Sequence, residues 1–199
     1  MSGRPLVLIG DVDGATQLWD LETGRPIGCS IDGGNGTSEA ADCTRLDGRS
    51  VVLISYIDGS LRLWDVETGE AVGRPLIGHT ARVTAVECIE IDGMPVAVTS
   101  SHDKTLRMWD LNTQSPLGRP LAGHTDWVSA MLCTELDGRP VAVTGSHDNT
   151  VRIWDLQRPA ATPTLIRLAN RCSALAVSDG RLVVAFGNDV AFFTRERAS

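Results

Sequence analysis

The stretch LDGRPVAVTGSHDNTVRIWDL, residues 136–156, decides the fold of this protein. It contains two short runs rich in Val, Ile and Thr, and each run is bounded by Gly, Asp, Pro or Asn. β-Branched residues between such turn formers are typical of β-strands joined by tight turns. The stretch therefore predicts consecutive antiparallel strands, the last of which ends in Trp154-Asp155.

The same organisation recurs along the chain with a constant step of 45 residues. Trp-Asp pairs begin at Trp19, Trp64, Trp109 and Trp154. Other residue types keep this phase, among them the Gly-His pairs at residues 78–79 and 123–124 and the Asp-Gly pairs at 47–48, 92–93 and 137–138. A repeat that keeps its phase without an insertion indicates one supersecondary unit in each period.

One period predicts a four-stranded antiparallel meander. We expect its strands at residues 83–91, 95–100, 105–109 and 119–121, and no part of the chain shows sustained helical periodicity. A sheet of this size has two apolar faces, and the stacking of successive sheets around an axis would bury both. The predicted fold class is therefore all-β, a β-propeller of four-stranded antiparallel blades.

The 45-residue period with Gly-His and Trp-Asp resembles the WD40 repeat family over nearly the whole chain. Residues 136–156 look in particular like actinobacterial WD40 arrays, and the chain resembles the C-terminal part of a β-propeller. The resemblance implies a buried hydrogen-bond network in each blade that joins His, Asp, a Ser or Thr hydroxyl, and the Trp indole. The matching residues are His79, Asp103, Ser101 or Thr99, and Trp109 in one blade, and His124, Asp148, Ser146 or Thr144, and Trp154 in the next.

The network is incomplete in the two earlier blades. The blade before His79 keeps Asp58 and Trp64, but Gly34 stands at the position of the His. In the first blade the matching residues are Asp13 and Trp19. A His-Asp pair could also orient a catalytic base, but the same pair recurs at the same spacing in two blades, and an active site is normally a single constellation. We therefore predict a structural role for these residues.

The expected strands do not complete a ring. We predict about four to five blades in an open arc within one WD40 repeat domain, residues 1–199. The parts are a partial blade 1–30, three blades 31–77, 78–122 and 123–168, and a partial last blade 169–199. This is the pattern expected of the C-terminal portion of a larger propeller or of a short gene product. Open blade edges invite pairing, which predicts either self-association or a weakly stable arc.

Composition excludes several classes of partner. The net charge is −7, which argues against a nucleic-acid or anionic-membrane surface. No apolar run approaches the roughly 20 residues that span a bilayer, and the start does not resemble a signal peptide. Five cysteines without short-spaced pairs predict neither a disulfide framework nor a zinc site. We expect a cytoplasmic bacterial protein without cofactor or metal.

Variation among the repeats points to a candidate binding surface. The family presents a face built from the loops before the first strand and between the second and third strands, where Arg82, Trp127, His102 and His147 lie. Trp127 stands where the preceding repeats carry Arg82 and Thr37, so the fold does not require an aromatic residue there. It is either an exposed anchor for a protein partner or a side chain packed on the neighbouring blade, and the sequence favours neither.

Three functions follow from this pattern. The leading hypothesis is a non-catalytic protein-binding scaffold or regulatory module whose partner is unknown. The first alternative is a truncated remnant of a larger WD40 regulatory protein that has no independent function. The second, which we disfavour, is an enzyme with a site in the central channel, for which Glu87, Glu90 and Glu135 are candidates by position alone.

Overall fold

The computed structural model describes residues 6–10, 15–32, 38–178 and 181–193. These residues form five antiparallel β-sheets and no helix. The predicted all-β class and the open arrangement of four-stranded sheets are thus confirmed. In the same part of the chain, no helix is long and apolar enough to span a membrane.

The strands follow one another in each sheet as consecutive hairpins. The first sheet consists of β1 (Leu6–Gly10), β2 (Ala15–Asp20) and β3 (Arg25–Asp32). The second consists of β4 (Ser38–Leu46), β5 (Arg49–Tyr56), β6 (Leu61–Asp65) and β7 (Ala71–Leu76). The third consists of β8 (Val83–Ile91), β9 (Met94–Ser101) and β10 (Thr105–Asp110), with β11 (Ser115–Pro116) and β12 (Leu121–Ala122) at its edge.

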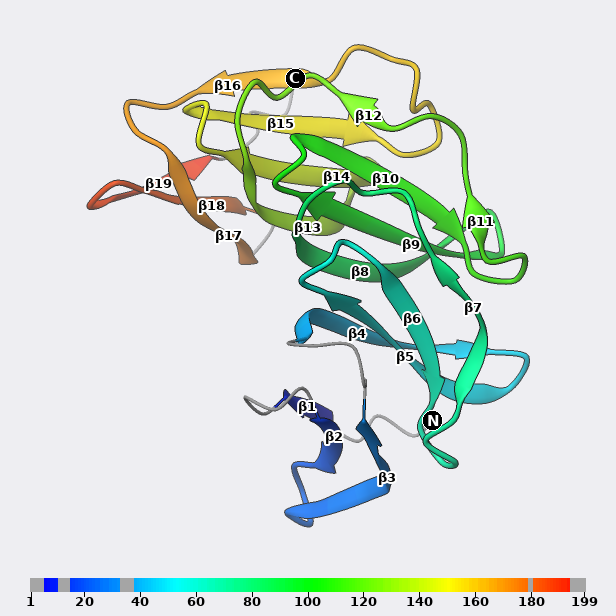
Figure 1. Cartoon of the computed structure of the whole chain (residues 1–199). Helices are drawn as coiled ribbons and strands as arrows, with labels where there is room; N and C mark the ends of the chain where they lie inside the picture. Colours follow the sequence, from blue (N-terminus) through cyan, green and yellow to red (C-terminus); the bar gives the residue numbers. More distant parts are fainter. Residues whose placement is uncertain (1–5, 11–14, 33–37, 179–180, 194–199) are drawn as a thin grey trace.

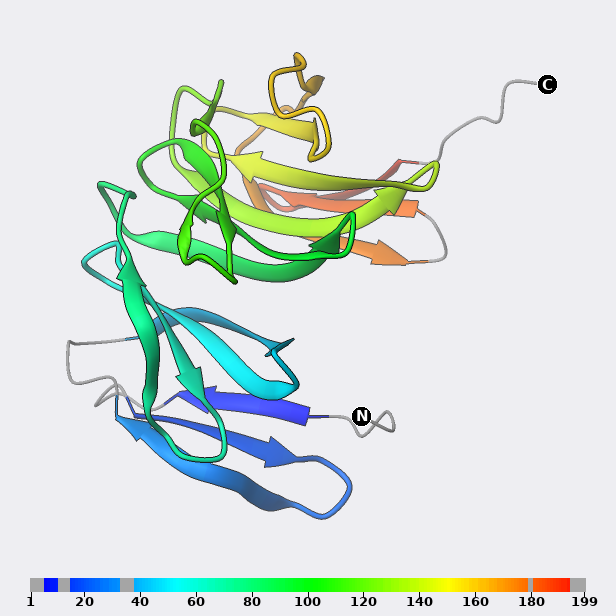
Figure 2. The same cartoon turned by 90° about the vertical axis from the view of Figure 1, so that its right-hand side faces the viewer.

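Two further sheets complete the described chain. The fourth consists of β13 (Val128–Leu136), β14 (Arg139–Ser146), β15 (Thr150–Asp155) and β16 (Thr164–Arg167). The fifth consists of β17 (Cys172–Ser178), β18 (Arg181–Phe186) and β19 (Asp189–Phe193). Figure 1 and Figure 2 show the sheets stacked face to face along an open arc, with the two three-stranded sheets at its ends. The blade boundaries expected from the repeat stay a prediction.

One strand differs from its predicted course. The sequence predicts an outer strand at residues 119–121, but β11 and β12 are two short pieces that both pair with β10. Between them the chain leaves the sheet at Gly118, where φ is +80°, and Pro120 has no backbone N–H to donate to a ladder. The third sheet therefore has a broken outer edge.

The Asp-Gly pairs form the tight turns that the sequence predicts. Asp92 and Gly93 have φ values of 52° and 78° between β8 and β9, and residues 47–48 and 137–138 behave in the same way. Two consecutive positive φ values match the type I′ turn, whose twist suits a two-residue hairpin. These turns set the register between the first two strands of the second, third and fourth sheets.

The cores between the middle sheets use the same repeat positions. The core between the second and third sheets consists of Leu46, Val51, Leu53, Leu61, Leu63, Leu76, Val83, Val86, Ala97, Trp109 and Leu111. The core between the third and fourth sheets consists of Ile91, Val96, Val98, Leu106, Met108, Leu121, Val128, Met131, Ala142, Trp154 and Leu156. Each residue of the second core stands 45 positions after its counterpart in the first. One packing solution is therefore used twice, and the Trp of each sheet points toward the sheet before it.

The Asp of each Trp-Asp pair closes the turn that follows it. Oδ1 of Asp65 accepts hydrogen bonds from the backbone N–H groups of Glu67 and Thr68, at 2.9 and 3.0 Å. Asp20, Asp110 and Asp155 make the same two bonds. The bonds from Thr68 and Glu67 lower the pKa of Asp65. The Trp therefore serves the core of a blade, while the adjacent Asp serves its outer turn.

Two neighbouring residues at the end of β7 provide a test of this packing. Leu76 is 1% exposed in the core between the second and third sheets, whereas Ile77 is 73% exposed. We expect Leu76→Ala to lower the free energy of unfolding by about 2–5 kcal/mol, because it leaves a cavity in the core. Ile77→Ala is the matched control and should change the free energy by less than about 0.5 kcal/mol. Urea denaturation followed by tryptophan fluorescence measures both; equal effects would contradict the packing.

Candidate functional site

A chain of hydrogen bonds crosses the third sheet from its core to a surface loop. The indole Nε1 of Trp109 donates to Oγ1 of Thr99 at 2.9 Å, and Oγ1 of Thr99 lies 2.8 Å from Nε2 of His79. Nδ1 of His79 lies 2.7 Å from Oδ2 of Asp103. The four residues come from different segments. The hydrogen bonds therefore connect the loop before β8 with β9, with β10 and with the turn between these two strands.

The bonds permit a consistent order of donors along the network. When Trp109 donates to the Thr99 hydroxyl, that hydroxyl can donate to Nε2 of His79, and Nδ1–H then donates to Asp103. Oδ2 of Asp103 also accepts the backbone N–H of Thr80, and its Oδ1 accepts both polar hydrogens of Thr105. Trp109, Thr99, His79 and Asp103 thus each have hydrogen-bond partners, which offsets the cost of burying their polar groups.

The fourth sheet repeats this arrangement. His124 lies 2.9 Å from Asp148 and 2.8 Å from the Thr144 hydroxyl, and Trp154 donates to that hydroxyl at 2.8 Å. Burial lowers the pKa of His124, so the imidazole is neutral in the folded state near pH 7. Burial alone would raise the pKa of Asp148, but hydrogen bonds, the largest from Thr150, outweigh it and lower the pKa to about 2.

The hydroxyls in these chains belong to threonine. The sequence leaves Ser or Thr open, and the structure places Thr99 and Thr144 between the His and the Trp. Ser101 instead donates to the carbonyl of Ala81 and accepts the backbone N–H of Asp103. Ser146 makes the equivalent bonds to Asp126 and Asp148. These serines therefore hold the loop backbone, while the threonines accept the indole hydrogen bonds.

The second sheet satisfies its Trp in another way. Ile54 stands at the position of Thr99, and the indole of Trp64 donates to the hydroxyl of Tyr56 at 3.1 Å. Asp58 is exposed and accepts the backbone N–H and the hydroxyl of Ser60. One tyrosine thus replaces the Thr-His pair, and the sequence repeat does not predict this replacement. Trp19 is half-buried, while Asp13 and Gly34 lie outside the described residues.

The glycine before each network His lies close to the Arg and Trp side chains of its sheet. A Cβ atom at Gly78 would lie 2.7 Å from Nη1 of Arg107 and 3.0 Å from the ring of Trp109. A Cβ atom at Gly123 would meet Arg152 at 2.6 Å. Arg107 on β10 and Arg152 on β15 therefore pack against the Gly-His loops.

Three of the four candidate binding residues form one aromatic stack. The ring of Trp127 lies parallel to that of His102, with centroids 4.4 Å apart and planes within 9°. On its other side His147 lies at 5.7 Å with a tilt of 42°. Trp127 directly precedes β13 and His147 lies in the turn between β14 and β15 of the fourth sheet, whereas His102 lies in the turn between β9 and β10 of the third. The stack therefore spans two adjacent sheets, and we call these residues, together with Arg82, the Trp127 surface.

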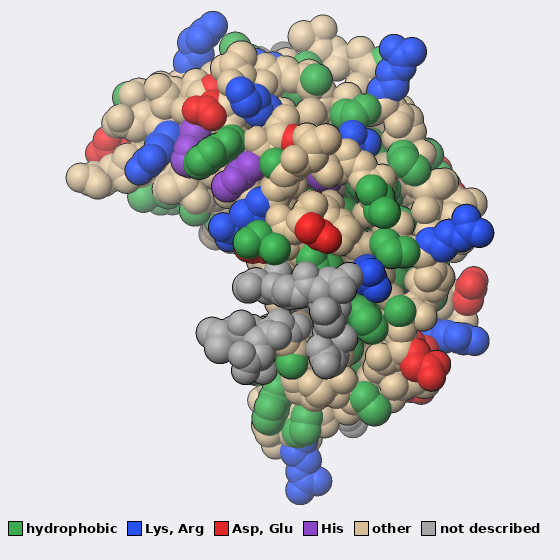
Figure 3. Space-filling view, viewed as in Figure 1, with side chains coloured by type: hydrophobic (Ala, Val, Ile, Leu, Met, Phe, Trp, Pro, Cys, Tyr) green, Lys and Arg blue, Asp and Glu red, His purple; other side chains and the backbone are tan. Residues whose placement is uncertain are grey.

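Arg82 joins this surface through the backbone and through charge. Its carbonyl accepts the N–H of His102, as the carbonyl of Trp127 accepts the N–H of His147. Its guanidinium forms an ion pair with Glu39 on β4. Burial lowers the pKa of His102, and the positive charge of Arg82 lowers it further. Figure 3 shows His side chains gathered near Lys and Arg side chains on this side of the arc.

Trp127 is both packed and exposed. The sequence left an exposed anchor and a packed Trp as equal alternatives, and the side chain is 47% exposed although it contacts two histidines. Lys104 reaches from the third sheet to the carbonyl of Thr125, which further joins the loop of Trp127 to the neighbouring turn. A held aromatic side chain that still offers half its area is suited to contact a partner.

The acidic residues of the first strands serve the contacts between sheets. Oδ2 of Asp42 on β4 accepts the backbone N–H of Cys88 on β8 at 2.7 Å. Glu87 occupies the equivalent position on β8 and bonds in the same way to the N–H of Cys133 on β13. Burial raises the pKa of Asp42 and of Glu87. Glu90 and Glu135, the other channel candidates, are exposed and stand apart from these bonds.

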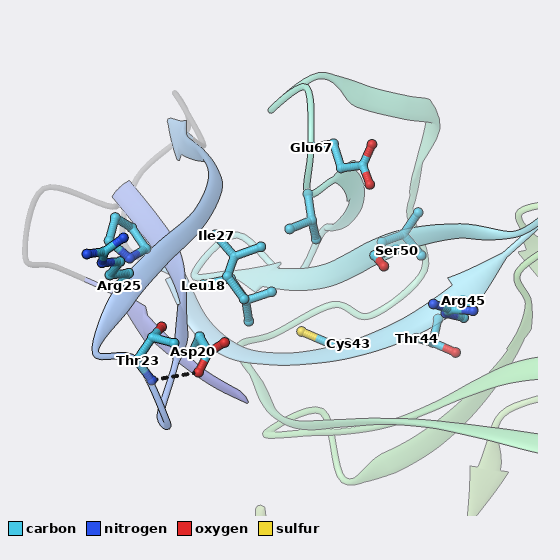
Figure 4. Close-up of a pocket in the computed structure, with 13 residues that line it drawn as sticks. Leu18, Asp20, Thr23, Arg25, Ile27, Cys43, Thr44, Arg45, Ser50 and Glu67 are labelled. Carbon is cyan, nitrogen blue, oxygen red and sulfur yellow. Dashed lines mark hydrogen bonds between the residues drawn. The ribbon is translucent and has the colours of Figure 1, made fainter. Parts of the chain in front are cut away.

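A cavity of about 700 Å³ lies between the first and second sheets. Figure 4 shows Leu18 and Ile27 on one wall and Cys43 on the other. Burial raises the pKa of Cys43 to about 11, so its thiol is protonated near pH 7 and is a weak nucleophile. A second cavity of about 380 Å³ lies between the last two sheets. Neither lining carries a His, and the described residues hold no cluster of three metal-ligating side chains.

Comparisons with known proteins agree with this geometry. The WD40 family, described as "WD domain, G-beta repeat", matches residues 71–110 and 115–155. The crystal structure of the computationally designed Ika8 protein is similar over 97% of this chain, with 23% identity and a TM-score of 0.74, and the chain spans 56% of that protein's length. The designed Ika4 protein is similar over 82% of this chain and 94% of its own, with 24% identity and a TM-score of 0.64. No curated protein matches the chain.

Removal of the Thr99 hydroxyl should destabilise the third sheet. Thr99→Val leaves the indole of Trp109 and Nε2 of His79 without their shared partner, and each is buried. We expect a loss of about 1–3 kcal/mol in the free energy of unfolding, the cost of a buried unsatisfied group. Urea denaturation measures the loss. Thr99→Ser keeps the hydroxyl and should retain most of the stability, so an equal loss in both variants would count against the hydrogen-bond account.

Stability should also decline in acid through His124. Because burial lowers its folded pKa below the ordinary value of 6.5, the unfolded chain binds a proton more readily. The stabilisation from neutral His124 is therefore complete above about pH 6.5 and is lost as the pH falls through the folded pKa. Urea midpoints between pH 7.5 and 5 should decline, and they should decline less steeply in His124→Gln. An unchanged slope in this variant would show that other groups cause the acid sensitivity.

Proposed function

We propose that this chain, which belongs to the WD40 repeat family, is a non-catalytic protein-binding module that acts through the Trp127 surface. WD40 repeats commonly mediate protein–protein interactions, and the fold itself hosts many functions. The proposal that this chain is a scaffold or regulatory unit therefore depends on a particular site and not on the fold alone.

The observation that carries the proposal is the half-exposed Trp127 held between His102 and His147. The two histidines restrict the indole, so little side-chain entropy remains to be lost when a partner covers it. Trp and Arg dominate the binding energy of many protein interfaces, and Arg82 lies on the same surface. A preorganised Trp beside an Arg is thus a reasonable centre for an interface.

Two other functions have less support. A channel enzyme would need carboxylates free for chemistry, but Glu87 is occupied by the N–H of Cys133. The His-Asp pairs recur in two sheets with the same bonds, which suits a structural role. A truncated remnant without a function would have no need of an exposed Trp held in a stack between two sheets. Whether the chain binds a partner decides between a binding module and such a remnant.

We also propose that copies of the chain associate, because the two end sheets have open edges and open faces. The cytoplasmic location and the absence of cofactor, metal, nucleic-acid and membrane partners stay predictions from composition and motifs. The identity of the protein partner is a matter for capture experiments.

Trp127→Ala should abolish or strongly weaken partner binding. The wild-type chain is tagged and used for affinity capture from the source cell, and an enriched protein is then titrated against both forms. We expect the substitution to weaken binding by about 2 kcal/mol or more, roughly thirtyfold, as for a hot-spot residue. Leu165→Ala on β16 removes an exposed apolar side chain elsewhere and should leave binding unchanged.

The same experiment separates the alternatives. Capture of the same partner with equal affinity by Trp127→Ala would refute the role of this surface while leaving a binding function in place. Failure of the wild-type chain to enrich any protein would favour the remnant.

A further inference from the structure

The two ends of the arc expose residues that are buried everywhere else in the repeat. Leu21, just after β2, is 58% exposed, although the equivalent residues Val66, Leu111 and Leu156 are at most 2% exposed. Ile9 on β1 is 51% exposed, whereas its equivalent Ile54 is completely buried. No other described residues cover this face of the first sheet. It has the composition of a core face without the sheet that would pack against it.

The exposed face of the first sheet is the kind that inserts into a preceding sheet. Val7 pairs with Trp19 across β1 and β2, as Ala97 pairs with Trp109 across β9 and β10. In both middle cores the Trp and the Leu two residues later pack against the sheet before them. Trp19 and Leu21 occupy these two positions and stand at the outer face of the first sheet, which we call the head face together with Val7 and Ile9.

The last sheet has the same orientation as the others but exposes the opposite face. On its inner face Phe193 pairs with Leu182, as Trp154 pairs with Ala142 in the fourth sheet, so Phe193 takes the position of the Trp. The inner face of the fifth sheet therefore packs against the fourth in the usual direction. Its outer face must then correspond to the face that receives a following sheet.

Strand register identifies the receiving residues. Val183 pairs with Phe192, and Ala185 with Val190, as Val143 pairs with Ile153, and Gly145 with Val151, in the fourth sheet. In the fourth sheet Val143 and Val151 are buried beneath the fifth sheet. Phe192 and Val190 are 66% and 57% exposed. We call the outer face with Val183, Ala185, Val190 and Phe192 the tail face.

We propose that the head face of one copy docks on the tail face of a second copy, in the manner in which consecutive sheets pack within the chain. The proposal rests on the self-association proposed above and specifies its contact. A second copy fits as the occupant because the head face carries the inserting positions of the repeat and the tail face carries the receiving positions. Each copy thus supplies the next sheet that the other lacks among its described residues.

This contact joins two different faces, so it is heterologous. Each copy keeps a free tail face after its head face is used, and the free faces either close a ring or bind further copies. A contact between two head faces would place Trp19 opposite Trp19 and would offer neither of them a receiving face. Apolar faces of this kind also rarely remain exposed in a monomer.

The test is a pair of charge substitutions that block one face each. Leu21→Asp blocks the head face and Phe192→Asp blocks the tail face, and both positions are exposed in the single chain. Light scattering after size-exclusion chromatography should give the wild type a mass above that of one chain, rising or constant with concentration. Each variant alone should have the mass of one chain, because every contact would include a blocked face.

Mixing the two variants gives the decisive result. The intact tail face of Leu21→Asp can receive the intact head face of Phe192→Asp, so the mixture should form a complex of one copy of each. A contact between like faces predicts the reverse: one variant alone would keep its assembly and mixing would add nothing. Ile77→Asp, an equally exposed position away from both faces, is the control and should keep the wild-type mass.

The outcomes separate this inference from the proposals on which it rests. A wild-type chain that stays single at all concentrations would overturn both self-association and the head-to-tail contact. Assembly that persists in both variants would overturn only the assignment of the faces. Circular dichroism checks that the variants fold, and Ile9→Asp and Val190→Asp address the same two faces if either first variant does not. Partner binding through Trp127 should be unchanged in all of them, because neither face includes that surface.

Discussion

The structure depends on the burial of one sheet face against the next. A single sheet cannot bury the apolar side chains on its own faces. Trp109 and Leu111 are therefore buried against Leu53, Leu61 and other residues of the sheet before them. Because the same eleven positions serve both middle junctions, the chain solves its packing once and repeats it. Among the described residues the first and the last sheet each pack against one other sheet, and Leu21 and Phe192 on their other faces are exposed.

The polar network serves the loops more than the core. The bonds from Trp109 through Thr99 and His79 to Asp103 begin in the apolar interior and end at the turn that carries His102. This turn forms one wall of the stack around Trp127. A network that satisfies buried groups therefore also fixes the position of the surface to which we assign binding, which explains how a structural motif can support a function without taking part in it.

Much of the fold was predictable because its signals are local and periodic. Asp92-Gly93 specifies its turn through two positive φ values, and the alternation of Val and Thr specifies strands. Other features had no such signal. Tyr56 replaces the Thr-His pair of the second sheet, Asp42 bonds across to Cys88, and the outer strand of the third sheet divides around Gly118. Each of these depends on which backbone lies nearby in space, and residue type at a repeat position does not reveal it.

The sequence by itself determined the repeat, the all-β class, the order of the strands and the candidate residues of the hydrogen-bond network. It did so because period, turn chemistry and apolar alternation are written along the chain. Only the tertiary structure decided that Thr99 accepts the indole hydrogen bond of Trp109, that Trp127 stacks between histidines of two sheets, and that Leu21 and Phe192 are exposed. These facts arise from distances between segments far apart in sequence, which packing alone sets.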